Sequence, residues 1–183
     1  MATTLQEAIN QFRQPVYVRT KRNDASYAAT STYVCDNVRR LVELYRNTKN
    51  DEQTKRLIRD DIDNALRRYH GYCIKENFGS HYIQKGLEGN GIFEHMVPNS
   101  TIRDMLLHGI ISPEQACNMP TCRLSVESDN ELKRKGWNTN TPDIWNFWKR
   151  YEFCFEVVGN FETWDGTAVD PKMTLADHFA KFL

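Results

Sequence analysis

The stretch IFEHMVPNSTIRDMLLHGIISPEQACNMPTCRLSVESDNELKRK, residues 92–135, decides the expected fold of the second half of the chain. Apolar residues at its start favour a strand, which Pro98 ends because proline cannot donate a hydrogen bond to a sheet ladder. Capping residues followed by apolar residues at helical spacing then favour short helices. The elements expected here are a strand at 92–97, helices at 99–108 and 112–116, an extended segment at 119–125 and a helix at 127–135.

Upstream of this stretch, two longer helices are expected at 32–47 and 51–69, where apolar residues recur every three to four positions. A short polar turn at 48–50 separates them, so they pack most simply as an antiparallel hairpin. The sequence therefore predicts a mostly helical α+β protein. It has an N-terminal helical region at 1–70, followed at 71–183 by a small strand-strand-helix unit and a C-terminal helical cap.

Glu94 and His95 are unusual because they place two polar, metal-competent groups inside an apolar strand. Neighbouring side chains in a strand point to opposite faces, but at a strand end or a bulge both can reach one site. A histidine at a strand end is also commonly a structural residue whose ring nitrogens are hydrogen-bonded. The downstream pattern favours a functional site, because Asn118 follows in a loop and Asp129 lies on the next expected helix.

The order of these residues resembles the HNH, or His-Me finger, endonuclease superfamily, in its phage-type form, over about residues 92–135. The matching positions are Glu94-His95-x-x-Pro98, Asn118 and the helix start at 125–130. In the family a histidine or asparagine on this helix usually supplies the last metal ligand, and here Asp129 or Asn130 stands in its place. The zinc-binding C-x-x-C pairs of many members are absent from this sequence.

This resemblance implies a ββα-metal-like unit that hydrolyses DNA phosphodiester bonds with one divalent ion, Mg²⁺ or Mn²⁺. Glu94 and Asp129 would hold the ion, since carboxylate oxygens suit hard cations. His95, in its neutral form, would take a proton from the attacking water, and Asn118 would orient its ring. Arg123 would bind the scissile phosphate through its forked, permanently charged side chain. Double-stranded DNA is the expected substrate in preference to RNA.

Three other functions stay open. One is a non-catalytic phage interaction or nucleic-acid-binding protein in which the HNH-like site is vestigial. Another is a hydrolase that uses His95 with Cys117 or Cys122 as its nucleophile. The third starts from residues 129–133, DNELK, whose spacing is similar to the E-x-K half of PD-(D/E)-x-K nucleases. That arrangement needs a strand, whereas this polar sequence favours a helix.

Basic residues concentrate in the first third of the chain. Residues 1–70 hold 13 Lys and Arg against 9 Asp and Glu, whereas residues 71–125 hold 4 against 5 and residues 126–183 hold 7 against 10. DNA phosphates are therefore expected to contact the first third. The candidate contacts lie in a basic arm at 16–29 and on the first long helix, and they are Arg19, Lys21, Arg22, Arg39, Arg40 and Arg46.

The composition is that of a globular protein, with 40% hydrophobic and 26% charged residues among 183 and a net charge of zero. These values exclude a fully disordered chain and a strongly cationic protein that wraps nucleic acid. No apolar run is long enough to cross a bilayer, so no membrane partner is expected. Five cysteines without a C-x-x-C pair are typical of reduced thiols. We therefore expect a cytoplasmic location, in a cell or in the host during phage infection. A homodimer is a possible assembly.

Overall fold

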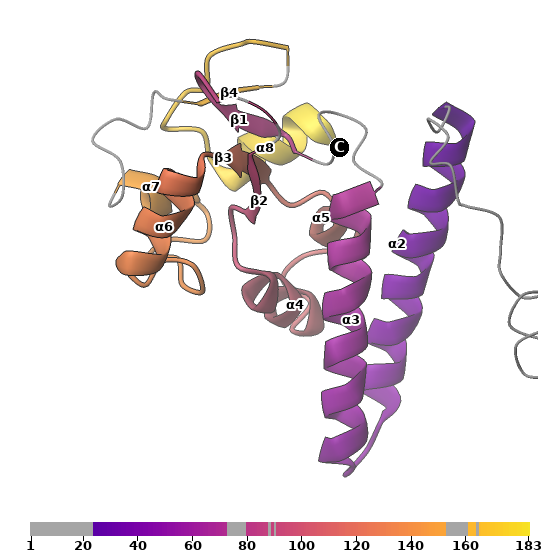
Figure 1. The fold of residues 1–183 in the computed structure, drawn as a ribbon. Coiled ribbons are helices and arrows are strands. Elements are labelled where there is room, and N and C mark those ends of the chain that lie inside the picture. The colour runs from indigo at the N-terminus through magenta and orange to yellow at the C-terminus, as the bar shows by residue number, and fades with distance from the viewer. Residues whose placement is uncertain (1–23, 73–79, 88, 90, 153–160, 164) are drawn as a thin grey trace, which may run out of the picture.

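The computed structural model describes residues 24–72, 80–87, 89, 91–152, 161–163 and 165–183. This part of the chain contains seven helices and one mixed four-stranded sheet, so the expected mostly helical α+β fold is confirmed (Figure 1). In chain order the elements are α2 (Asp24–Asn47), α3 (Glu52–Tyr72), β1 (Tyr82–Gln84), β2 (Ile92–His95), α4 (Asn99–Leu107), α5 (Pro113–Cys117), β3 (Thr121–Leu124), α6 (Val126–Arg134), α7 (Lys149–Glu152), β4 (Phe161–Thr163) and α8 (Leu175–Phe182). None of the described helices is long and apolar enough to span a bilayer.

Helices α2 and α3 form the expected hairpin, one end of which projects away from the sheet (Figure 1). Each helix buries one apolar stripe: Val34, Val38 and Val42 on α2, and Ile58, Ile62 and Leu66 on α3. α2 begins at Asp24 rather than at the expected Thr32. The added segment contains three alanines, which favour a helix even without an apolar stripe. The expected arm at 16–29 therefore ends in a helix, and its residues 16–23 lie outside the described part of the chain.

The sheet has the strand order β2-β3-β1-β4. β1 and β3 are parallel, whereas β2–β3 and β1–β4 are antiparallel pairs. Gly91 leads into β2 with a φ of 56°, and a Cβ here would lie 2.7 Å from the carbonyl oxygen of Leu124. Only glycine tolerates both this conformation and this close approach. β2 ends at His95, two residues earlier than expected, and Met96 donates its backbone N–H to the carbonyl of Pro120.

Aromatic side chains fill the core on which the sheet rests. The rings of Tyr82, Phe147, Trp148, Tyr151 and Phe161 are buried and contact one another. They join β1, β4 and the α7 region into one packed unit. In the region of the expected C-terminal helical cap, α7 has only four residues.

Strands β2 and β3 and helix α6 form the expected strand-strand-helix unit. The register pairs Ile92 with Leu124 and His95 with Thr121. Ser125 follows β3 directly and caps α6 by accepting a hydrogen bond from the backbone N–H of Ser128. Helices α4 and α5, which connect the two strands, lie between the sheet and the hairpin (Figure 1). The end of β2 is thereby brought close to the end of α3.

Candidate functional site

Glu94 and His95 point to opposite faces of the β2–β3 pair. Glu94 is opposite Cys122 and His95 is opposite Thr121, in a regular register without a bulge. The two side chains therefore do not converge directly, as a strand end would have allowed. His95 faces the end of α3, whereas Glu94 faces the side of α6 and α7.

His95 is held by a second histidine, His70, on the buried face of α3. His95 Nε2 lies 3.0 Å from His70 Nδ1, and His70 Nε2 lies 3.1 Å from the carbonyl oxygen of Ala116. Because a carbonyl only accepts, His70 carries its hydrogen on Nε2 and leaves Nδ1 to accept from His95. In the neutral His95 ring, Nδ1 is then unprotonated. No hydrogen bond to this nitrogen is present among the described residues.

Both imidazoles of this pair are uncharged near neutral pH. Burial lowers the pKa of His70 to about 4, because the positive form loses its hydration. Burial also lowers the pKa of His95 well below its ordinary value, and the nearby His70, Arg67 and Arg150 act in the same direction. His95 is nevertheless only half-buried as a residue, so solvent reaches part of it. The pair therefore presents a neutral, oriented histidine at the end of a strand.

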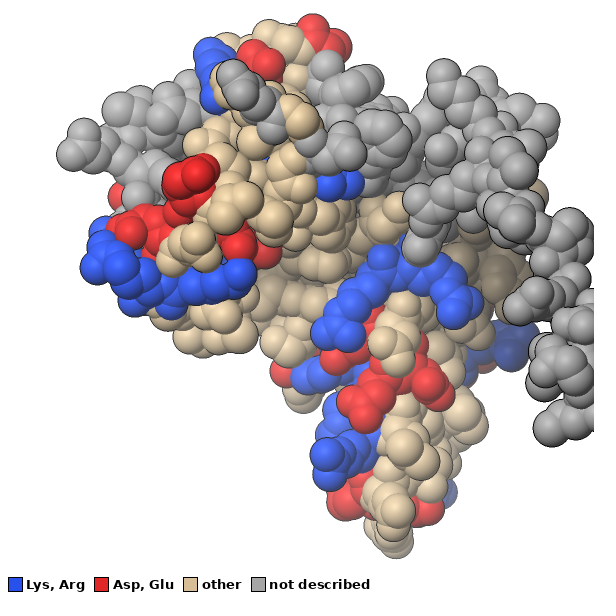
Figure 2. Space-filling model, in the orientation of Figure 1, with Lys and Arg blue, Asp and Glu red and all other residues tan. Residues whose placement is uncertain are grey.

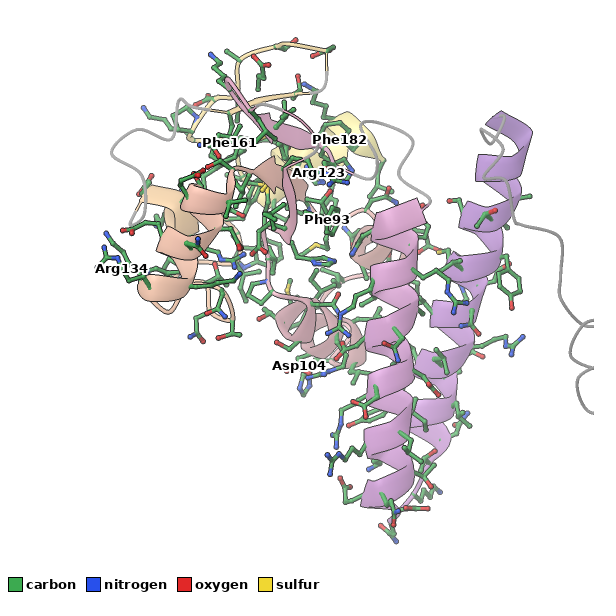
Figure 3. All side chains as sticks on the ribbon, in the orientation of Figure 1. Phe93, Asp104, Arg123, Arg134, Phe161 and Phe182 are labelled. Atoms are coloured by element: carbon green, nitrogen blue, oxygen red, sulfur yellow. The ribbon has the colours of Figure 1, made fainter. Side chains whose placement is uncertain are left out.

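Arg123 lies on the same face of the sheet as His95. Its guanidinium is 5.6 Å from the centre of the Phe93 ring, and that ring is 5.1 Å from the His95 ring. Figure 3 shows Phe93 and Arg123 beside one another on the side of β2 that faces α3. Arg123 Nε also donates to the hydroxyl of Ser80 at 3.2 Å, and burial lowers the pKa of the guanidinium. The structure thus brings together His95 and one predicted phosphate ligand.

Glu94 forms an ion pair with Arg150, whose side chain is fully buried. Arg150 Nη2 donates to Glu94 Oε1 at 2.5 Å, while Nε and Nη1 donate to the carbonyls of Trp137 and His95. Burial raises the pKa of Glu94, and Arg150 opposes that shift. Arg150 thus holds Glu94 and the end of β2 together.

Asp129 is buried on α6 and pairs with Lys133 one turn later, at 2.5 Å. Its negative charge is among the factors that raise the pKa of Glu94, so the two carboxylates interact electrostatically. Two carboxylates suit Mg²⁺ or Mn²⁺, which commonly take one or two from the protein and complete their shell with water and phosphate oxygens. The carboxylates of Glu94 and Asp129 are the type of ligand that such an ion prefers. No cluster of three candidate ligands occurs among the described residues.

Asn118 does not contact His95. Its side chain donates to the carbonyl of Glu114 at 2.9 Å, and its own carbonyl accepts from His178 Nε2 at 2.7 Å. Asn118 thus ends α5 and anchors α8. The orienting contact predicted for Asn118 is made in the structure by His70.

The predicted DNA contacts are only partly described. Arg19, Lys21 and Arg22 lie outside the described residues. Arg39 is paired with Asp36 and Glu114, whereas Arg40 and Arg46 are exposed and form no ion pair in the described part of the chain. Figure 2 shows basic and acidic side chains interleaved over the hairpin and α6, not a uniformly basic face.

The structure offers little support for the other chemistries considered. Residues 129–133 lie in helix α6, not in the strand that an E-x-K site needs. Cys117 and Cys122 are completely buried, and burial raises the pKa of Cys122 far above that of a nucleophilic thiol.

Two residues of the site, His70 and Arg150, were not predicted from the sequence. His70 follows Ile62 and Leu66 at four-residue spacing, which places a polar residue on the buried stripe of α3. This spacing could have identified His70 from the sequence. Arg150 carries no comparable signal, because its partners on and next to β2 lie more than 50 residues away in sequence.

Comparisons with protein-family models, curated proteins and solved structures find no match to this chain.

Proposed function

We propose that this protein is a metal-dependent endonuclease that hydrolyses DNA phosphodiester bonds with His95 as general base. The observation that carries the proposal is the His95–His70 hydrogen bond, which leaves an unprotonated Nδ1 on a neutral, half-buried histidine. A general base needs that protonation state and a fixed direction. The strand-strand-helix order of β2, β3 and α6 supports the same reading.

In this proposal each residue has one role. His95 Nδ1 takes the proton of the attacking water, and Arg123 donates to the scissile phosphate. Glu94 and Asp129 would hold Mg²⁺ or Mn²⁺ on the opposite face of the β2–β3 pair, where the ion would supply positive charge. DNA would have to pass round the end of β2 for this charge to reach the phosphate bound at His95 and Arg123. Exposed arginines such as Arg40 and Arg46 contact the backbone of double-stranded DNA.

A second candidate is a non-catalytic nucleic-acid-binding protein with a vestigial site. The ion pairs Glu94–Arg150 and Asp129–Lys133 favour it, because each occupies one carboxylate oxygen that a metal would otherwise use. Both carboxylates keep a second oxygen, which a metal could still use.

The test is cleavage of supercoiled plasmid with Mg²⁺ or Mn²⁺, against EDTA. His95→Ala should lower the rate by roughly 10²–10⁴-fold, the usual contribution of a general base. The matched control is His108→Ala, since His108 is exposed and lies outside the site. Failure to cleave plasmid, single-stranded DNA or RNA with any metal would overturn the proposal. DNA binding retained in a gel-shift assay would then support the second candidate.

A further inference from the structure

One face of the sheet carries a row of four half-buried side chains that crosses all four strands. The register pairs Phe93 of β2 with Arg123 of β3, and Arg123 with Ile83 of β1. Ile83 is in turn paired with Glu162 of β4. Because residues paired across strands point to the same face, the four side chains lie side by side. The row spans about 14 Å, which is three strand spacings of about 4.8 Å.

The two faces of the sheet differ in how far they are covered. On the opposite face, the residues next to the row in sequence are at most 1% exposed, because they pack into the aromatic core; they are Tyr82, Cys122, Leu124 and Phe161. All four residues of the row keep partial exposure. A ligand can therefore reach the face that carries the row.

Arg123 is held in a fixed position within the row. Its guanidinium lies 5.6 Å from the centre of the Phe93 ring, and its Nε donates to the hydroxyl of the buried Ser80 at 3.2 Å. His95 lies on the same face of β2, and its ring is 5.1 Å from that of Phe93. The row thus passes the proposed general base and places a positive charge beside it, which suits a phosphate.

Beyond Arg123, the row offers an apolar side chain and then a carboxylate. Ile83 is the apolar residue, and Glu162 forms no ion pair with any residue in the described part of the chain. A nucleobase is recognised by apolar contact with its ring and by hydrogen bonds to its edge. Arg123 and Glu162 are two strand spacings apart, about 10 Å, so a phosphate at one and a base edge at the other belong to the same nucleotide.

We propose that Ile83 and Glu162 form a subsite for an unpaired guanine, in the nucleotide whose phosphate Arg123 binds. The place of this phosphate rests on the proposed function. The two oxygens of Glu162 accept from N1–H and the amino group of guanine, which are adjacent donors on its Watson–Crick edge. Adenine and cytosine offer an amino group beside an acceptor nitrogen, and thymine offers one N–H between two carbonyls. These three bases therefore match the carboxylate less well.

A base inside a duplex cannot reach this subsite. The major groove of B-DNA is about 12 Å wide and admits a helix or a two-stranded ribbon, whereas the row extends across four strands. The Watson–Crick edge of a paired guanine is also occupied by cytosine. The base must therefore leave the stack. The inferred substrate is a DNA duplex with an unpaired guanine at the cleavage site.

The experiment measures the binding of the full-length protein to fluorescein-labelled DNA duplexes by fluorescence anisotropy, in EDTA so that no metal-dependent cleavage occurs. The duplexes share one sequence and differ only in a single central bulged nucleotide, which is G, A, C or T. A fully paired duplex completes the set. We expect the guanine bulge to bind roughly ten-fold more tightly than the thymine bulge, the usual discrimination of one bidentate contact.

Two variants assign the contacts. Glu162→Gln replaces one acceptor oxygen by a donor, so the affinity for the guanine bulge should fall to within about twofold of that for the thymine bulge. Ile83→Thr keeps a β-branched residue in the strand and should weaken the binding of every bulged duplex, but not of the paired duplex. Glu52→Gln is the matched control, because it makes the same change of charge at an exposed position at the start of α3.

Equal affinity of the wild-type protein for the guanine and thymine bulges would overturn the subsite. A guanine preference that persists in Glu162→Gln would do the same. These results do not depend on cleavage, so they are separate from the test of the nuclease. A guanine preference in a protein that cleaves no nucleic acid would overturn only the nuclease. Plasmid cleavage by a protein without a guanine preference would overturn only the subsite.

Discussion

His178 and His95 are both neutral histidines, but they differ in how many ring nitrogens are hydrogen-bonded. His178 Nδ1 accepts from the Tyr82 hydroxyl at 2.7 Å, and Nε2 donates to the carbonyl of Asn118 at 2.7 Å. Within the described part of the chain, His95 uses only Nε2, which donates to His70. A histidine with both nitrogens occupied joins parts of the fold. One with a single nitrogen occupied is positioned and still able to accept a proton.

The surroundings sharpen this difference. The His178 ring packs against His81 at 4.8 Å and Phe182 at 4.8 Å, and the residue is completely buried. His95 is half-buried and lies beside Phe93 and the guanidinium-bearing face of β3. The region of β1 and α8 therefore resembles a packed core. The end of β2 resembles a solvent-accessible site.

The largest expected effect is acid destabilisation, which acts on both regions. Burial lowers the pKa of both His70 and His178 to about 4. As pH falls below 6.5 the unfolded chain binds protons while the folded protein does not, so stability is lost between about pH 6.5 and 4 and is unaffected above that window. These two residues alone lower the free energy of unfolding by about 5 kcal/mol near pH 4.5. Urea unfolding at pH 7, 6 and 5 measures this loss.

The pH dependence has a direct control. His178→Asn cannot protonate, so the variant should lose less stability between pH 7 and 5 than the wild type loses. A free energy of unfolding that stays constant over this interval in the wild type would contradict the neutral state of His70 and His178.

The second effect concerns the ion pair between Arg150 and Glu94, the residue next to His95. Arg150→Met removes the donor to Glu94 and to the backbone of β2, and leaves the mostly buried carboxylate of Glu94 without its partner. We expect a loss of about 3–5 kcal/mol in the free energy of unfolding. Adding Glu94→Gln to this variant should restore part of the loss, because the buried charge is removed. Equal stability of the single and double variants would show that the unpaired Glu94 carboxylate does not cause the loss of stability in Arg150→Met.

The third effect tests the structural role of His178. His178→Ala removes the acceptor of Tyr82 and the donor to Asn118 and leaves a cavity, so we expect a loss of about 3 kcal/mol. His95→Ala breaks a single hydrogen bond at a half-buried position and should cost about 1 kcal/mol. Thermal unfolding of the two variants compares them. The reverse order would mean that the two histidines have been assigned the wrong roles.

The smallest effect separates positioning from folding at His70. His70→Leu removes the acceptor for His95, whereas His70→Asn keeps an acceptor oxygen near the place of Nδ1. Both variants lose the bond to Ala116, so they form a matched pair. Plasmid cleavage should fall roughly 10- to 100-fold in the leucine variant and much less in the asparagine variant. Equal rates in the two variants would remove His70 from the mechanism.

The helices were largely predictable because apolar residues recur at helical spacing. The stripes of α2 and α3 and the capped α6 and α8 all follow from local sequence. The early start of α2 was not predicted, since segment 24–31 has high helix propensity but no apolar period. The end of β2 was also misplaced, because a strand ends where its partner ends, and the sequence does not contain the register.

The site was predictable only in part. The sequence identified Glu94, His95 and Arg123, and the structure places two of these three on one face. It assigned the orienting role to Asn118 because an asparagine in a loop resembles the family pattern. In the structure His70 makes that contact, because the end of α3 lies next to the end of β2. Such a contact depends on tertiary packing, which local spacing does not encode.

Arg150 has a consequence for synthesis on the ribosome. It donates to the carbonyl of His95, which leaves the ribosome 55 residues earlier. Until Arg150 arrives, the end of β2 lacks its anchor and Glu94 lacks its ion-pair partner. A nascent or C-terminally shortened chain therefore lacks both contacts, and the end of β2 is completed only after the last third of the chain has been made.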